Sequence, residues 1–423
     1  MKKGLIAAVL STALLFGTMP VQAGYESTDE IALSVRPMTC GEGVYIPDDA
    51  QNRVYVSPDA AVAGTTVHFG VYIEAERAEI CFLSMMVQSD CDTITLNKNT
   101  FQKPNVIINE LGDTYTLPNG QTFNSRWKPY CLGTLSSSGT YSPSCYMMDT
   151  NFMENENAIR LTWMHGLGNA TSFLGGTSDS YTFIEVDAEI APGTQPGIYH
   201  LSFIADDSIS ISQSPTYISS DESKGGASAY SDIIPALKNA EIIVGSCSLD
   251  NEETAFRTSE DTTAFTAQDF TGNVRQLGAN GFRTVPLTTD GMTLLSPVST
   301  PSDIKVTVPQ IITAQLEYEG LPVLTPSGKP AEVQYRVGLR GDANMDGSTN
   351  ASDAAVMLIY AAEYGSSGNA ALADNADDEA FVQYLANVNR DAQINASDAA
   401  CTLIYAAVAG SGSTPNWSQI LQK

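Results

Sequence analysis

The chain is short of basic residues: 21 Lys and Arg stand against 48 Asp and Glu in 423 residues, and the formal net charge is −27. No cluster of Lys or Arg interrupts this acidic background, so the chain repels phosphate backbones and anionic lipid head groups. Nucleic acid and membrane surfaces are therefore excluded as expected partners. Hydrophobic residues make up 43% of the chain, which is enough for folded cores and argues against wholesale disorder.

Residues that mark catalytic sites are also scarce. His68, His165 and His200 do not form a metal-ligand pattern, and the chain has neither a Gly-x-Ser-x-Gly nucleophile turn nor a Gly-rich phosphate loop. After the first residues, no stretch reaches the roughly 18 apolar residues that a membrane-spanning helix needs. We therefore assign no catalytic residue, and glycoside hydrolysis is the one enzyme activity that stays open.

The first residues carry the pattern of an export signal. Lys2 and Lys3 precede an apolar run over residues 5–16, and small residues stand before a cleavage point that we place after Ala23. Residues 1–23 are thus predicted to be a signal peptide, and the protein to be secreted and extracellular. An uncleaved membrane helix is the alternative, which suits so short a segment poorly.

A repeat stands near the C-terminus, where the sequence of residues 350–355 recurs at residues 395–400. The first copy is preceded by a loop with Gly347 at position 6 and oxygen-bearing side chains at positions 1, 3, 5, 7, 9 and 12. Ca²⁺ takes about six to eight oxygen ligands, so the chain must wrap around it with this spacing. The predicted metal ligands are Asp342, Asn344, Asp346, Ser348, Asn350 and Asp353.

The second loop has a weaker set of ligands. It carries two carboxylates where the first loop carries three, and Ala392 stands where the sharp turn favours glycine, so we expect a strained turn and weaker Ca²⁺ binding. A metal-free turn that caps a helix is the alternative. We expect no helix directly before either loop. The predicted ligands are Asn387, Asn389, Asp391, Gln393, Asn395 and Asp398.

The duplicated loop and helix, over residues 340–412, resembles a dockerin. Dockerins are plug modules that attach proteins to cohesin sockets on polysaccharide-degrading complexes of the cellulosome type. The resemblance implies two Ca²⁺ ions, the first bound more strongly, and a cohesin-bearing scaffold protein as partner. Because the copies are nearly identical, it also implies two binding orientations related by a half-turn. The implied partner-facing residues are Ala351, Ser352, Leu358, Ile359, Ala396, Ser397, Leu403 and Ile404.

The two repeat helices are apolar nearly all round, which a module this small cannot fully bury. We expect part of this surface to pack between the helices and part to dock on the partner.

Upstream, apolar and polar residues alternate over residues 67–73, 181–190, 198–204 and 240–244, which predicts the strands of an antiparallel sandwich. Their order resembles a cohesin, and it implies a jelly-roll-like sandwich over residues 30–247 that binds a dockerin-bearing protein. Residues 97–157 exceed what such a module needs and are predicted to be an insertion. Residues 206–232 are predicted to be a loop or excursion of this module, since the strand after them completes the pattern.

Residues 248–338 also show a strand pattern, at 304–308, 312–318 and 331–339, and are predicted to be a small Ig-like spacer. The predicted fold is therefore multidomain and mainly β, with a small α-helical, EF-hand-like dockerin near the C-terminus and a tail over residues 413–423.

Seven cysteines are present, and in an exported protein six of them permit up to three disulfides. Cys131 and Cys145 are the favoured short-loop pair, and reduced thiols are the alternative. Cys401 replaces Val356 of the first repeat, so we expect it to act as a small buried hydrophobe. The six are Cys40, Cys81, Cys91, Cys131, Cys145 and Cys247.

Two functions follow from these patterns. The preferred one is a non-catalytic adaptor that plugs into a multi-enzyme complex through its dockerin and presents its own cohesin-like module. The alternative is a carbohydrate-binding or glycoside-hydrolysing sandwich delivered by the same dockerin, with Trp127 and Trp163 as an aromatic platform for a polysaccharide. Aromatic residues of a sandwich are more often part of the core.

Overall fold

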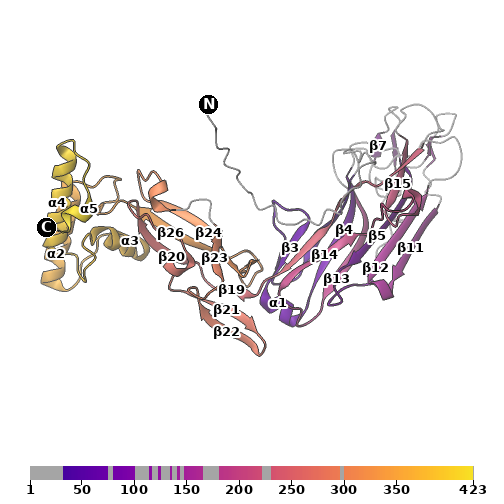
Figure 1. Ribbon diagram of the computed structural model, residues 1–423, viewed down its shortest axis with the longest axis horizontal. Helices are drawn as coiled ribbons and strands as arrows, with labels where there is room; N and C mark the ends of the chain where they lie inside the picture. Colours follow the sequence, from indigo (N-terminus) through magenta and orange to yellow (C-terminus); the bar gives the residue numbers. More distant parts are fainter. Residues whose placement is uncertain are drawn as a thin grey trace, which may run out of the picture.

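The computed structural model describes residues 32–74, 80–100, 114–116, 122–124, 134–135, 141–142, 147–164, 181–221, 230–295 and 300–422. Three parts follow one another along its longest axis: a β-sandwich, a smaller β module and a group of helices (Figure 1). Their cores lie within residues 33–244, 247–337 and 343–420. The protein is mainly β, as predicted. The predicted signal peptide lies outside the described residues.

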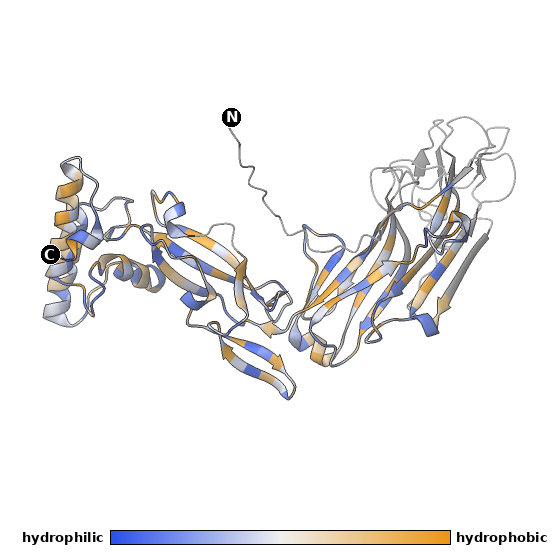
Figure 2. Cartoon of the chain, in the orientation of Figure 1, coloured by the Kyte–Doolittle hydropathy of each residue, from blue (hydrophilic) through white to orange (hydrophobic). Residues whose placement is uncertain are grey.

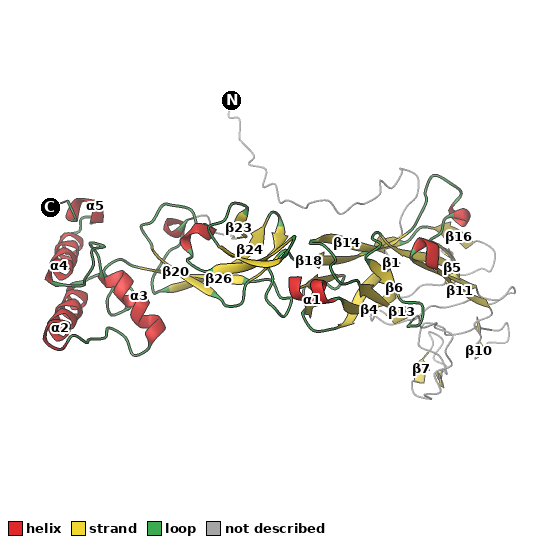
Figure 3. Cartoon of the chain, turned by 90° about the horizontal axis from the view of Figure 1, so that it is seen from below, coloured by secondary structure: helices red, strands yellow, loops and turns green. Residues whose placement is uncertain are grey.

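The front part consists of two sheets that enclose one core (Figure 3). The first sheet has the order β17-β1-β4-β13-β6, with β1 (Ala32–Cys40), β4 (Thr65–Glu74), β6 (Ile94–Leu96), β13 (Tyr181–Ile190) and β17 (Ala236–Lys238). The second has the order β11-β12-β5-β14-β18-β3-β2, with β2 (Val44–Tyr45), β3 (Arg53–Val56), β5 (Ile80–Ser89), β11 (Met147–Met153), β12 (Ala158–Met164), β14 (Gly197–Phe203) and β18 (Ala240–Val244).

The strand alternation seen in the sequence builds the core between these sheets. Val67 and Phe69 of β4 are fully buried, in one cluster with Leu83 and Leu161 of the opposite sheet. Burying apolar area contributes about 25 cal/mol per Å², so a Phe69→Ala substitution is expected to cost about 3–5 kcal/mol. A short helix, α1 (Pro58–Ala63), lies at one end of the sandwich.

One prediction for the front part needs correction. The sandwich is not purely antiparallel, because β1 pairs in parallel with β17 and β18 pairs in parallel with β3. The predicted loop or excursion over residues 206–232 contains the hairpin β15 (Tyr217–Asp221) and β16 (Tyr230–Ile233), which extends the sheet along β5. Its sequence is mostly polar because the hairpin contributes little to the core beyond Ile218.

Part of the predicted insertion joins the sandwich, since β11 is the edge strand beside β12. The insertion also contains two short pairs, β7 (Thr114–Thr116) with β8 (Thr122–Asn124), and β9 (Thr134–Leu135) with β10 (Tyr141–Ser142).

The middle module has two small sheets around the buried Tyr335, whose hydroxyl donates to the Thr266 carbonyl at 2.7 Å. The predicted strand at 304–308 is wrong. Pro301 instead begins a 3-10 turn (Pro301–Asp303) capped by Thr300, and Pro309 lacks the amide that a ladder needs. The strands are β19 (Cys247–Ser248), β20 (Glu253–Thr258), β21 (Asn273–Gly278), β22 (Gly281–Pro286), β23 (Met292–Leu295), β24 (Gln310–Tyr318), β25 (Leu321–Pro322) and β26 (Glu332–Gly338).

The C-terminal part contains α2 (Ala351–Ser367), α3 (Ala376–Ala386), α4 (Ala396–Gly410) and α5 (Trp417–Ile420). Helix α3 ends directly before Asn387, so the expectation that no helix precedes the second loop is wrong. The predicted tail also differs, because Trp417 stacks on Tyr405 at 4.4 Å and joins the core of this module.

The thiols of Cys40, Cys91, Cys247 and Cys401 are free. Three disulfides among the six front cysteines are therefore excluded, while the pair Cys131 and Cys145 lies outside the described residues. Cys401 is half-buried against the helical core. No helix in the described part of the chain is both long and apolar enough to cross a membrane.

Candidate metal centre and docking surface

The first loop of the repeat folds around its own carboxylates. Asp342 accepts hydrogen bonds from the amides of Asp346 (3.1 Å) and Gly347 (2.9 Å), and Asp353 accepts one from the amide of Asn350 (2.8 Å). Gly347 has a φ of +81°, in the left-handed region that favours glycine. The last of these bonds belongs to a capping box that starts α2, so the same carboxylate shapes both the loop and the helix.

Two of these carboxylates are buried without a positive partner. Asp342 and Asp353 are fully buried, and within the described residues neither forms an ion pair. Burial, followed by the charges of Asp353 and Asp346, raises the pKa of Asp342 to about 6. Because an uncompensated buried carboxylate is costly, the loop fits a cation that oxygen atoms can surround.

The second loop repeats most hydrogen bonds of the first, but not those to position 1. Four acceptors of loop one have a counterpart 45 residues later, and the bond lengths agree closely; for example, the bond that starts the helix is 2.8 Å in loop one and 2.9 Å in loop two. Met345 and Arg390 also share a φ of +58° at position 4. The matched acceptors are Asn344 and Asn389, Asp346 and Asp391, Asn350 and Asn395, and Asp353 and Asp398.

Position 1 of the second loop holds a buried oxygen that no protein group satisfies. The side-chain Oδ1 of Asn387 is buried and accepts no hydrogen bond, while its Nδ2 donates to the Asp391 carbonyl at 2.7 Å. Buried polar atoms are nearly always paired, so an orphaned acceptor at the first ligand position fits a cation.

The donor sets of both loops are rich in oxygen and contain no sulfur or imidazole. Among the described residues, no group of three or more His, Cys, Asp and Glu side chains forms a metal cluster. Amide, hydroxyl and carboxylate oxygens together suit Ca²⁺ rather than Zn²⁺. The arrangement can hold a hard cation, and Ca²⁺ binding at both loops stays a prediction.

The strained turn expected at Ala392 is wrong. Among the described residues, the non-glycine positions with positive φ are Asn157, Glu319, Met345 and Arg390, and Ala392 is not one of them. The second loop avoids the left-handed turn that Gly347 makes in the first, so alanine fits there without strain.

Two arginines that sequence reasoning missed hold the second loop. The Arg340 guanidinium donates to the Val388 carbonyl from its Nε at 2.8 Å, lies 3.7 Å from Glu260 of the middle module and lies over the Trp417 ring. Arg390 lies over the ring of Tyr384 at 3.7 Å. The one signal that was available is that loop two has an arginine where loop one has Met345.

The middle module touches the first loop and helix α3, which lies between the two copies of the repeat. A Cβ at Gly347 would overlap the Thr307 carbonyl, so the first loop lies directly on Thr307 and Val308. Helix α3 packs on β20 and β26, where the Phe256 ring meets Phe381 at 5.3 Å and Arg336 pairs with Asp378 at 2.5 Å.

The repeat helices bury one side and expose another (Figure 2). Met357 and Thr402 are buried between α2 and α4 and touch at 3.6 Å. All eight residues predicted to face a partner are exposed, including Ile359 at 60% and Ile404 at 40%. An apolar surface of this kind is typical of an interaction site.

The predicted aromatic platform falls largely outside the described residues. Nothing is described of Trp127, and Trp163 lies opposite Leu83 in the β12–β5 ladder with its side chain outside the described set. The platform stays a prediction.

No family model and no curated protein matches the sequence. Among solved structures, the chain is similar to a chain of a type I cohesin–dockerin complex from Clostridium thermocellum, with 10% identity over 51% of this chain and 98% of that chain and a TM-score of 0.26. A type III cohesin module from a cell-surface anchoring scaffoldin of Ruminococcus flavefaciens is similar with 8% identity over 52% of this chain and 89% of that chain, and the TM-score is 0.25. The collagen adhesin of S. aureus is similar with 10% identity over 42% of this chain and 44% of that chain, and the TM-score is 0.21.

Cohesin modules are thus among the structures that this chain is similar to. The front part is a sandwich by its own strand order and shared core.

Proposed function

We propose that this protein is a secreted, non-catalytic adaptor with a Ca²⁺-dependent plug at its C-terminal end. The plug binds a cohesin-bearing scaffold protein of a polysaccharide-degrading complex. The front sandwich acts as a cohesin-like socket for a second, dockerin-bearing protein. The chain would thereby extend or branch the complex.

The observation that carries this proposal is the pair of matched helix surfaces. Leu358 and Ile359 on α2 and Leu403 and Ile404 on α4 are all between 40% and 60% exposed. Each helix starts with the same capping hydrogen bonds, so each helix offers a partner nearly the same surface. A cation in the loops would fix the start of each helix and with it the position of these side chains.

The described outer face of the second sheet supports the socket half of the proposal. Gln88 of β5 and the exposed Arg160 of β12 point away from the core, beside Met86, which is buried. A largely polar face of this kind suits a protein surface better than an apolar ligand. The stacked rings of Phe82 and Tyr217, 4.9 Å apart, lie at one end of this face.

Binding of the full chain to a panel of immobilised cohesins, in Ca²⁺ and in chelator, tests the plug. We expect the native chain to bind in a Ca²⁺-dependent way. The double variant Leu358→Asp, Ile359→Asp should lose only about twofold in affinity, because the second copy still binds. The same change in Leu403 and Ile404 is expected to behave alike. All four changes together are expected to weaken binding more than about 100-fold, as a lost hot-spot cluster does.

Ile311→Asp is the matched control, since Ile311 is 62% exposed on the middle module. Circular dichroism of the fourfold variant checks that its helices are intact. Full binding in chelator, or by the fourfold variant, would contradict the plug. Capture of dockerins by the fourfold variant tests the socket separately, because that variant has lost the plug surface.

A further inference from the structure

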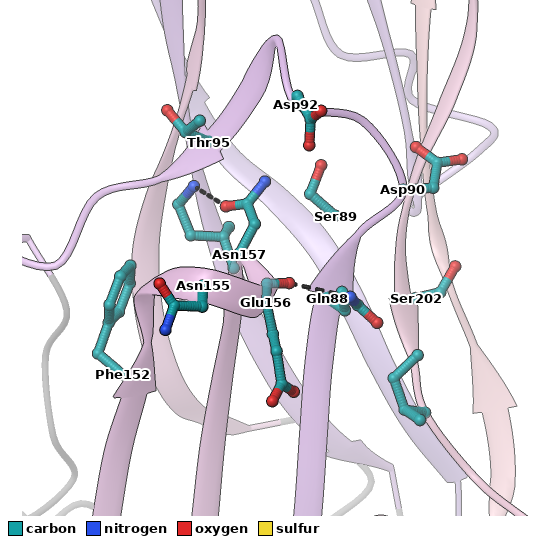
Figure 4. Close-up of a pocket in the computed structure, with 12 residues that line it drawn as sticks. Gln88, Ser89, Asp90, Asp92, Thr95, Phe152, Asn155, Glu156, Asn157 and Ser202 are labelled. Atoms are coloured by element: carbon teal, nitrogen blue, oxygen red, sulfur yellow. Dashed lines mark hydrogen bonds between the residues drawn. The ribbon is translucent and has the colours of Figure 1, made fainter.

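A polar cavity of about 600 Å³ lies where the β5–β6 loop meets the turn that joins β11 to β12 (Figure 4). Phe152 of β11 forms one wall, and Asp92, Asn155 and Ser202 come from three different segments of the sandwich. The volume falls within the range of about 300–1,000 Å³ that is usual for small-molecule sites.

The walls of this cavity are held together by hydrogen bonds. Asn157 has a φ of +47°; its Nδ2 donates to the Ile94 carbonyl at 2.7 Å and its Oδ1 accepts from the Leu96 amide at 2.9 Å. Gln88 donates from its Nε2 to the Glu156 carbonyl at 2.9 Å. These bonds join β5, β6 and the β11–β12 turn, so the cavity is formed before a ligand arrives. A preformed site loses little conformational entropy on binding.

Several polar groups of the cavity remain available to a ligand. Among the described residues, the side chains of Asp92, Asn155 and Ser202 have no hydrogen-bond partner in the protein. Asp92 and Asn155 are exposed, and Ser202 is half-buried. The cavity therefore offers carboxylate, amide and hydroxyl groups from separate walls, which can bind hydroxyl groups from several directions.

The charge and shape of the cavity narrow the class of ligand. Asp90, Asp92 and Glu156 all line it, so an anion is repelled, and an apolar molecule would leave these groups without partners. The half-buried Phe152 adds one apolar wall, which suits the C–H face of a sugar ring. We propose that this cavity binds a neutral saccharide, as an activity of the front sandwich that is separate from the partner surface of α2 and α4.

Isothermal titration of the full chain with soluble cello-, xylo- and malto-oligosaccharides tests this proposal, in Ca²⁺ and again in chelator. We expect saturable binding of at least one series in both conditions, because the cavity contains none of the predicted metal ligands. Asp92→Asn and Asn155→Ala are each expected to weaken that binding about tenfold, since a hydrogen bond to the ligand is lost.

Asp290→Asn and Asn369→Ala are the matched controls, since both side chains are exposed on other modules and should leave binding unchanged. Unfolding curves show whether the cavity variants keep their fold. The proposal is overturned if no oligosaccharide binds, if binding survives both cavity variants, or if spermidine binds the cavity while the saccharides do not.

Discussion

The two loops of the repeat share most of their internal hydrogen bonds but are anchored to the rest of the protein differently. Loop one has a buried aspartate at position 1 and lies through Gly347 on Thr307 of the middle module. Loop two has the uncharged Asn387 at the same position and is held by Arg340, which donates to the Val388 carbonyl. The comparison teaches that loops of nearly one shape can be anchored in two ways, by contact with the middle module in loop one and by arginine contacts in loop two.

Removing Ca²⁺ is the strongest way to separate the two loops. We expect a chelator to destabilise residues 340–412 by about 4 kcal/mol, for an ion previously present at about a thousand times its Kd. Amide hydrogen exchange should accelerate first at Gly347, because loop one depends on the ion for charge balance. The amide of Val388 should stay protected longer. Equal acceleration at both loops, or none, would contradict the comparison.

Gly347→Ala should disrupt the contact between loop one and Thr307 of the middle module. The substitution puts a Cβ on a left-handed residue and against the Thr307 carbonyl, so we expect the free energy of unfolding to fall by about 3 kcal/mol in urea. Ala392→Gly is the matched change in loop two, where φ is not left-handed, and should cost at most about 1 kcal/mol. Similar losses in both variants would show that the two turns are equivalent.

Arg340→Met should weaken loop two selectively. The variant keeps a long apolar side chain but loses the donor to the Val388 carbonyl, which should lower the free energy of unfolding by about 2 kcal/mol. Hydrogen exchange at residues 387–395 should rise more than at residues 342–350. Arg160→Met is the control, since Arg160 is exposed on the front sandwich, and it should leave hydrogen exchange at both loops unchanged. If Arg340→Met left the free energy of unfolding and the hydrogen exchange unchanged, loop two would also need the ion to keep its shape.

Exchanging the side chains at position 1 of the two loops should bring their Ca²⁺ affinities closer together. Asp342→Asn removes a charge from loop one and should weaken its Ca²⁺ binding about tenfold, or about 1.4 kcal/mol. Asn387→Asp adds a charge to loop two and should strengthen its binding by a similar factor. Calorimetric titration of the full chain, with the native chain as reference, measures both. If the Ca²⁺ affinity of a loop does not change in its variant, the side chain at position 1 is not a ligand in that loop.

The loops were predictable from the sequence because their geometry is local. Each acceptor lies within about twelve residues of its donor, so the spacing of oxygen-bearing side chains determines the hydrogen bonds. The start of each helix follows in the same way, from Asn350 with Asp353 and from Asn395 with Asp398. The long alternating strands of the sandwich were also predicted, because one of their faces is buried along its whole length.

Contacts between distant segments were not predictable. Arg340 reaches Val388 across 48 residues, and nothing near either residue indicates the pairing. Strand β20 was missed because its partner β26 lies about 80 residues away and supplies the ladder that its polar sequence does not suggest. The polar cavity was missed for the same reason, since β5, the β11–β12 turn and β14 contribute to it separately.

The parallel pairing of β20 with β26 determines how the middle module carries tension. After the short β19, the chain reaches Glu253 at the start of β20, and it leaves the module after Gly338, at the end of β26. A pull on the two ends of the protein therefore acts along these neighbouring strands in opposite directions. Their hydrogen bonds are loaded in shear and must break together rather than one at a time. A protein tethered to one partner at each end would thus have a force-resistant link between them.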